Sequence, residues 1–99
     1  MRPIHLAHLD KERPVLILTR ELVRPHLARV TVAPITTTVR GLSTEVRVGV
    51  ANGLEQESVV SCDNVLTVPA STLGRRIGHL LPAQELELAE SIRAAFELV

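Results

Sequence analysis

The stretch Val32-Ala33-Pro34-Ile35-Thr36-Thr37-Thr38-Val39-Arg40-Gly41 continues a strand and then becomes a polar turn. The residues just before it, Arg29-Val30-Thr31-Val32, are β-branched in alternation with polar ones, which predicts the strand. Pro34 lacks a backbone donor and therefore belongs near an edge, a bulge or the end of regular pairing. Gly41 can adopt positive φ and completes the turn. Hydroxyls at a strand end with a nearby cation suit a phosphate or polyanionic ligand. The alternative is a solvated threonine-rich turn.

The composition describes a globular chain with almost no aromatic side chains. The chain has 99 residues, 45% of them hydrophobic, and Phe96 is its only aromatic residue. This length and apolar content can bury a core of ordinary size and exclude a disordered chain. Surfaces that hold unpaired bases usually stack them on aromatic rings. Base recognition by this chain would therefore depend on hydrogen bonds and arginine planes.

The charges balance overall but are unevenly divided along the chain. A formal net charge of zero argues against a non-specific nucleic-acid coat. Residues 1–47 carry eight Arg or Lys against four Asp or Glu, a net of +4, whereas residues 48–99 carry three against seven, a net of −4. The first half is therefore expected to form a basic pole that can attract a phosphate chain.

A single cysteine, Cys62, excludes an intrachain disulfide and a cysteine-rich zinc site, and it favours a reducing cytoplasm. No apolar run approaches the roughly 20 residues that span a bilayer, so no membrane partner is expected. The beginning, Met1-Arg2-Pro3-Ile4-His5, lacks the apolar region of a signal peptide. We expect no cofactor and no metal, because no histidine spacing indicates a metal site.

The first half of the chain predicts strands and loops without a crossover helix. A first strand is expected over residues 3–9, a charged turn over 10–13, and a central strand over 14–19, whose apolar run is nearly continuous. Residues 20–28 form a loop because Pro25 ends any helical turn there. The strand of residues 29–36 follows. Without a crossover helix between residues 19 and 60, the sheet must be mostly antiparallel.

The second half predicts more short strands and one terminal helix. Residues 44–50 alternate strictly, which predicts a strand with Val46, Val48 and Val50 inward. Further strands are expected at 57–62, 65–68 and 76–81, with a helical or 3₁₀ turn closed by glycine over 69–74. The helix spans 82–99, with Leu88, Ile92, Ala95 and Val99 at helical spacing. These elements predict one mainly β domain over residues 1–99, a small bent barrel capped by a helix.

Several segments together resemble the MazF/PemK/Kid family of bacterial toxin–antitoxin toxins. They occur in the family's order across nearly the whole chain: Arg13-Pro14-Val15-Leu16-Ile17-Leu18, Val32 to Gly41, Ser58-Val59-Val60-Ser61-Cys62-Asp63-Asn64, Thr67-Val68 and Leu73-Gly74-Arg75-Arg76-Ile77-Gly78. Two places depart from the family pattern. The segment before Arg13 is very short, where the family usually has a longer glycine-containing loop, and Val65-Leu66 stands where many members place an arginine.

The resemblance implies an SH3-like barrel with a C-terminal helix, assembled as a homodimer. It implies a metal-independent endoribonuclease that cuts single-stranded RNA at short sequences. It also implies a cognate, MazE-like antitoxin whose flexible acidic and apolar tail blocks the RNA groove, with contact to operator DNA only through that antitoxin. In this family the arginine of the Arg-Pro element and the Ser/Thr of the Ile-Thr element are catalytic, and they match Arg13 and Thr36.

Those residue types suit RNA cleavage without a cofactor. A 2′-OH attacks the phosphorus, and Arg13 can stabilise the charge on the phosphoryl oxygens through its forked donors. Thr36 would position a phosphate oxygen or the 2′-OH, and the product would be a 2′,3′-cyclic phosphate. Thr37 and Arg40 are candidate RNA contacts, or else a solvated loop. Asp63 and Asn64 offer hydrogen-bonding groups for base edges, or else form an Asx-type turn.

Alternatives remain at this point. The same fold could form a non-catalytic binding module that acts on a protein target such as DNA gyrase, as the related CcdB toxins do. A degenerate family member retained for antitoxin binding is the third possibility. Arg13 could simply pair with Asp10 or Glu12. Arg75 and Arg76 are expected to be a solvated pair, or else one of them touches RNA while the other points away. Cys62 is expected to be a buried small hydrophobe.

Overall fold

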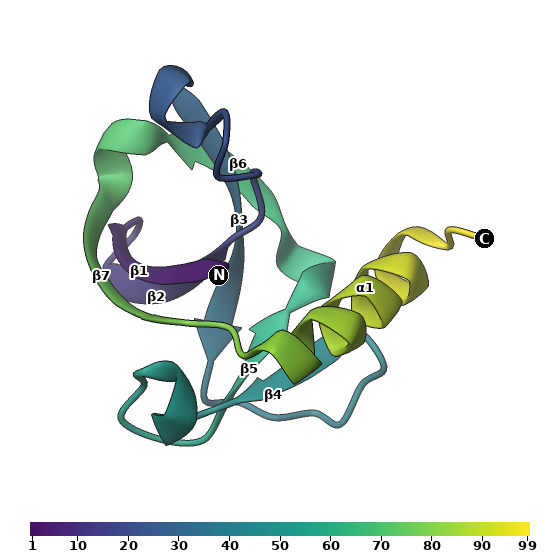
Figure 1. The fold of residues 1–99 in the computed structure, drawn as a ribbon. Helices are drawn as coiled ribbons and strands as arrows, with labels where there is room; N and C mark the ends of the chain where they lie inside the picture. The colour runs from purple at the N-terminus through teal and green to yellow at the C-terminus, as the bar shows by residue number, and fades with distance from the viewer.

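Seven strands and one α-helix follow one another in the computed structural model, which describes all residues 1–99 (Figure 1). The strands are β1 (Pro3–His8), β2 (Glu12–Ile17), β3 (Arg29–Thr36), β4 (Glu45–Val48), β5 (Ser58–Ser61), β6 (Leu66–Pro69) and β7 (Leu73–His79), and the helix is α1 (Pro82–Phe96). Four 3₁₀ turns lie between them, at Arg24–His26, Val50–Asn52, Cys62–Asn64 and Ala70–Thr72. The helix is not long and apolar enough to cross a membrane.

The long strand β3 joins the two parts of the sheet. Its first half pairs with β6, from Arg29 opposite Pro69 to Val32 opposite Leu66, and its end pairs with β5. On its other edge β3 pairs with β2, which continues through β1 to β7. All these pairs are antiparallel. Pro34 lies where the neighbour of β3 changes from β6 to β5, so its missing donor interrupts no ladder there.

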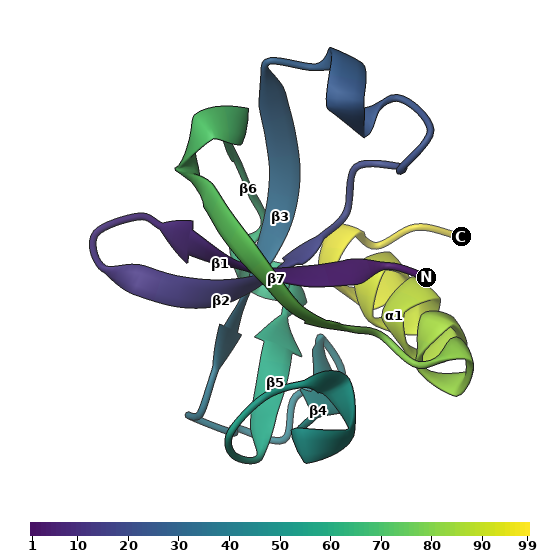
Figure 2. The ribbon, with the colours of Figure 1, turned by 60° about the vertical axis from the view of Figure 1, so that its left-hand side comes forward.

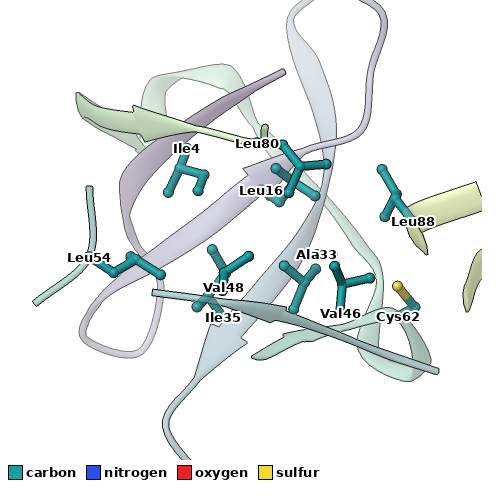
Figure 3. Packing of buried hydrophobic residues seen from close by; sticks show 11 residues of the cluster. Ile4, Leu16, Ala33, Ile35, Val46, Val48, Leu54, Cys62, Leu80 and Leu88 are labelled. Atoms are coloured by element: carbon teal, nitrogen blue, oxygen red, sulfur yellow. The ribbon is translucent and has the colours of Figure 1, made fainter. Parts of the chain in front are cut away.

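Two apolar cores lie on the two faces of the central strands. One contains Val15 and Ile17 of β2 with Val30 and Val32 of β3. The other contains Leu16 of β2 and residues of β3, β4 and α1, and Figure 3 shows its side chains converging. Because successive side chains point to opposite faces, a strand buried on both faces reads as a continuous apolar run. The prediction of a central strand is thereby confirmed, but its bounds differ from the expected 14–19. The strand begins at Glu12, inside the turn expected over 10–13, and ends at Ile17.

Helix α1 is fixed to the sheet by a buried amide network. Asn52, only 2% exposed, accepts a hydrogen bond from the Gly49 backbone N–H at 3.0 Å and donates to the His79 carbonyl at 3.0 Å. Its amide also donates to Gln84 Oε1 at 2.6 Å, and Gln84 lies in the first turn of α1. The loop packs so tightly on β7 that a Cβ on Gly78 would lie 1.8 Å from the Asn52 carbonyl oxygen.

The predicted fold class is confirmed: a mostly antiparallel sheet curls into a half-barrel and a C-terminal helix packs against it. Figure 2 shows the turn between β1 and β2 on the opposite side of the molecule from α1. The short turn of this hairpin and the loops at the ends of β3 and β5 supply the candidate site.

Several predicted details are wrong. The strand expected over 44–50 ends at Val48, because the chain enters a 3₁₀ turn at Val50, which is 75% exposed and not inward. The helix ends at Phe96, because Glu97 takes a left-handed conformation with φ 53°, which leaves Val99 outside the helix. The turn after β6 is 3₁₀ as expected, but Gly74 does not close it and belongs to β7.

Candidate active site

Arg13 and Thr36 lie on neighbouring antiparallel strands. Strand β2 pairs with β3 from Ile17 opposite Val32 to Val15 opposite Pro34, and Arg13 and Thr36 each lie two residues beyond this last pair, at the same end of the sheet. Arg13 also pairs with Ala7 of β1, which fixes its backbone in the hairpin. The proline after Arg13 holds that residue in an extended conformation. Residues far apart in the sequence are thus adjacent in the sheet.

Two adjoining hollows meet at this pair. The first, about 550 Å³, is called here the Arg40 hollow, and its polar lining includes Asp10, Thr38, Arg40, Glu45, Ser61, Asp63 and Asn64. The second, about 600 Å³, is called the Arg75 hollow, and its lining includes Lys11, Thr37, Glu55, Gln56 and Arg75. Arg13, Ile35 and Thr36 line both hollows. The predicted catalytic pair therefore lies at the junction of one extended groove.

Asp10 and Arg13 form a two-point ion pair at this junction. Nε and Nη2 of Arg13 donate to Oδ1 and Oδ2 of Asp10 at 3.0 and 3.2 Å. The sequence left open whether Arg13 pairs with Asp10 or with Glu12, and in the structure it pairs with Asp10. The hydrogen bond from Arg13 lowers the pKa of Asp10 from 3.8 to about 2, and the same bond raises the pKa of Arg13. Nη1 of Arg13 has no partner within the chain and remains available to a ligand.

The hydroxyl of Thr36 is oriented by the turn that follows β3. Its Oγ1 accepts a hydrogen bond from the Thr38 backbone N–H at 3.1 Å. This local bond from residue i+2 is the ST-turn arrangement. Because Oγ1 acts only as an acceptor in this bond, the hydroxyl proton of Thr36 is free to be donated into the groove. Thr36 is half-buried, unlike the exposed threonines after it.

The four predicted substrate contacts are divided between the two hollows. Arg40, Asp63 and Asn64 line the Arg40 hollow, whereas Thr37 lines the Arg75 hollow. Glu45 accepts hydrogen bonds from the backbone N–H of Arg40 at 3.2 Å, and the exposed Arg40 side chain has no partner within the chain. Thr44 Oγ1 donates to Asp63 Oδ2 at 2.6 Å, and Asn64 Nδ2 donates to Ser61 Oγ at 2.7 Å.

Sequence reasoning missed some lining residues. Asp10 and Lys11 lie in the groove because the β1–β2 turn is so short that it brings both beside the end of β3. Arg75 also lines the Arg75 hollow, while Arg76 turns back to the Gly78 carbonyl. Both arginines are exposed, which confirms the predicted solvated pair, and the alternation along β7 points their side chains apart as expected.

Two other side chains that can exchange protons, those of Cys62 and His8, lie outside both hollows. Cys62 is buried as predicted, and burial, together with Asp63, raises the pKa of its thiol to about 11. A thiol with that pKa stays protonated and is a poor nucleophile. His8 is exposed and lines neither hollow. Among residues 1–99, no three His, Cys, Asp or Glu side chains lie together in a group that could hold a metal ion.

A curled β half-barrel with one terminal helix and an arginine–threonine groove defines a class, the small β toxins of toxin–antitoxin modules. The sequence profile of the family described as "PemK-like, MazF-like toxin of type II toxin-antitoxin system" matches residues 3–96, and the chain belongs to this family. The chain is 70% identical over 98 residues to endoribonuclease MazF3 of Mycobacterium tuberculosis, covering 99% of this chain and 95% of the relative.

Solved structures agree with the family. The M. tuberculosis toxin MazF-mt6 superposes with a TM-score of 0.97 at 69% identity, covering 99% of both chains. A mycobacterial endoribonuclease in complex with its cognate antitoxin superposes with a TM-score of 0.86 at 26% identity, covering 98% of this chain and 93% of that one. The predicted family and enzyme class, a MazF-type endoribonuclease toxin, are confirmed.

Proposed function

We propose that this chain cuts single-stranded RNA at the junction of the two hollows, with Arg13 and Thr36 as catalytic residues and without a metal. The observation that carries the proposal is the position of this pair: both side chains line both hollows, so one phosphodiester can contact both of them. The family supplies the reaction class, and the contacts within the groove support a role for each residue.

Arg13 is the charge-stabilising group in this proposal. Asp10 engages Nε and Nη2, which fixes the plane of the guanidinium and leaves Nη1 for a phosphoryl oxygen. Negative charge increases on the phosphoryl oxygens as the 2′-oxygen attacks, and a fixed cation stabilises that charge more than the ground state. Guanidinium is too weak an acid to be the proton donor of the reaction.

Asp10 is the positioning residue for Arg13. It is the carboxylate in contact with Arg13, it lines the Arg40 hollow, and its lowered pKa keeps it ionised, which makes it too weak a base to be the proton acceptor. The 2′-OH gives its proton to water as the bond from the 2′-oxygen to phosphorus forms. The bond from phosphorus to the 5′-oxygen breaks, and that oxygen takes a proton from water. The products are a 2′,3′-cyclic phosphate and a 5′-OH end.

Thr36 and the remaining polar residues position the RNA. The free hydroxyl proton of Thr36 suits a phosphate oxygen at the junction. Arg40 has an unpaired guanidinium in the Arg40 hollow, while Lys11 and Arg75 add two cations to the Arg75 hollow. We assign Thr37, Arg40, Asp63 and Asn64 to substrate binding. Phosphate contacts would fix the register, and Asp63 and Asn64 would contact base edges.

The proposed partners of this chain are those that the family resemblance implies. A solved mycobacterial relative is in complex with its cognate antitoxin, which supports a cognate antitoxin whose flexible tail would occupy this groove. Any contact with operator DNA would pass through that antitoxin. Exposed apolar residues on and after α1, Leu86, Phe96 and Leu98, support a homodimer of single domains over residues 1–99. The substrate makes the cytoplasm the site of action.

One assay tests the proposal. Purified protein is incubated with a long RNA of little secondary structure in EDTA, and the new ends are mapped. Cuts at a short recurring sequence, with 5′-OH and 2′,3′-cyclic phosphate ends, are expected. Intact RNA together with growth arrest on expression would instead indicate a protein target such as DNA gyrase.

A further inference from the structure

Little packing holds the loop between β3 and β4. Residues 37–43 are all exposed and belong to no helix or strand (Figure 1). This loop carries Arg40, whose guanidinium has no partner within the chain, whereas the other cation of the Arg40 hollow, Arg13, is paired. Hydrogen bonds must therefore set the position of the one unpaired cation in this hollow.

Glu45 makes every hydrogen bond of residues 39–43 within the chain. Its Oε1 accepts from the backbone N–H of Arg40 at 3.2 Å and from that of Leu42 at 3.1 Å, while Oε2 adds a longer bond of 3.4 Å to Arg40. The backbone N–H of Glu45 donates to the Leu42 carbonyl at 3.1 Å. Gly41 has a left-handed φ of 73°, a conformation that lets the N–H groups on either side converge on one anion. One carboxylate oxygen thus closes the loop.

Glu45 is itself fixed to the sheet. It begins β4, where it pairs with Ser61 of β5, and the next residue, Val46, is buried in the core. The Cys62 backbone N–H donates to the Thr44 carbonyl at 3.0 Å, which fastens the chain just before Glu45. The exposed loop is therefore tied to a rigid element through one side chain. A binding group that is held in place beforehand loses less conformational freedom when its ligand binds.

We propose that Glu45 is a positioning residue for RNA binding, whose carboxylate orders residues 39–43 so that the Arg40 guanidinium is held in the Arg40 hollow before RNA binds. The inference rests on the proposed RNA cleavage and adds to it a residue that acts through Arg40. As an anion, Glu45 repels phosphate, so its contribution to binding comes from the loop that it orders and not from its charge. These two effects have opposite signs, and an experiment can therefore separate them.

The substitution Glu45→Ala removes the carboxylate and releases residues 39–43. The affinity for a non-cleavable RNA analogue should fall by about tenfold, because binding must then order the loop. The single-turnover cleavage rate at saturating RNA should stay within about twofold of wild type, since Arg13 and Thr36 are unchanged. Glu87→Ala, which removes a carboxylate from exposed helix surface, is the control and should leave both quantities unchanged.

The substitution Glu45→Gln separates the order of the loop from the charge. Because Oε1 accepts from both N–H groups, the amide oxygen of glutamine can replace it. Glu45→Gln should therefore bind the analogue at least as tightly as wild type. Glu45→Asp, whose carboxylate is one methylene too short to reach both groups, should bind as weakly as Glu45→Ala and replaces it should that variant not fold by circular dichroism.

Arg40→Ala tests whether Glu45 acts through Arg40. The double variant with Glu45→Ala should bind the analogue within about twofold of Arg40→Ala alone, and losses that add in full would refute the proposal. Two other results refute it: Glu45→Ala binding as tightly as wild type, or Glu45→Gln binding as weakly as Glu45→Ala. If wild type binds the analogue but cuts no RNA, the proposed cleavage fails, and these affinities still decide the role of Glu45. If wild type does not bind the analogue, both proposals fail.

Discussion

Arg13 is paired within the chain and still available to a ligand. The carboxylate of Asp10 engages Nε and Nη2, so the guanidinium is held in one plane while Nη1 remains unpaired. A lysine could carry the charge but could not be held by two parallel bonds and still offer a planar donor. The short β1–β2 turn makes this possible, since it places Asp10 three residues before Arg13 at the mouth of the groove.

Asp10→Asn should reduce cleavage. An amide has one acceptor oxygen and no charge, so it cannot hold the Arg13 guanidinium by two parallel bonds. Misplacement of Arg13 should cost up to roughly 10² in rate. Single-turnover cleavage measures the effect, and circular dichroism of the variant should match wild type because Asp10 is exposed. Retention of the wild-type rate would show that Asp10 does not position Arg13.

The pH dependence of cleavage should reflect the lowered pKa of Asp10. A carboxyl with a pKa of about 2 remains ionised well below the usual 3.8. A depressed pKa means that the Asp10–Arg13 pair is fully formed above 3.8 and is lost only as pH falls through about 2. Initial rates measured downward from neutral pH, with folding followed in parallel, should show no loss of activity centred near 3.8. A protonation step there in folded protein would contradict the assignment.

For the strands and the helix, the sequence predicted those features that a local pattern of residues controls. The strand of residues 29–36 and the helix start at Pro82 are confirmed, because alternation, apolar spacing and proline act locally. Val50 continued a perfect alternation but lies outside the strand. The chain turns there because Asn52 is drawn into the core by its hydrogen bonds to Gly49, His79 and Gln84. Such long-range bonds leave no periodic signal.

The Asn52 network should be the main polar contribution to holding α1 on the sheet. Asn52→Ala leaves the buried Gly49 N–H and the Gln84 side chain without their partner. An unsatisfied buried group costs about 1 to 3 kcal/mol, so the free energy of unfolding in urea should fall by about that amount. Asn64→Ala removes an exposed amide and is the matched control, expected to lie within about 0.5 kcal/mol of wild type. Equal free energies of unfolding for the two variants would show that the Asn52 network does not hold α1 on the sheet.

The candidate site was only partly predictable, because contacts between distant segments decide which side chains reach it. Arg13 and Thr36 carry recognisable local patterns, and the family resemblance drew them together before any register was known. Arg75 belongs to the groove only because β7 begins at Leu73 and its alternation turns that side chain, not Arg76, toward the hollow. Asp10 reads as an ordinary turn residue until the hairpin is folded.

For the whole molecule, the net charge of zero extends into the groove, where cations and carboxylates alternate. The two hollows are lined by four cations, Arg13, Arg40, Lys11 and Arg75, and by five carboxylates, Asp10, Glu12, Glu45, Glu55 and Asp63. Because RNA binding releases counterions, affinity should fall with salt, and each phosphate contact contributes about 0.7 to the logarithmic slope for a single strand. Arg40→Ala should lower that slope by about 0.7 in binding of a non-cleavable RNA analogue. An unchanged slope would show that Arg40 contacts no phosphate.

The role of Arg13 in catalysis is tested by the single-turnover cleavage rate of Arg13→Ala beside that of Arg24→Ala. Both arginines pair with an acid three residues before them, but Arg24 lies outside both hollows. Loss of the charge-stabilising donor should slow Arg13→Ala by about 10² to 10³, while Arg24→Ala stays near the wild-type rate. A folded Arg13→Ala protein that cuts the same RNA at the wild-type rate would contradict the account.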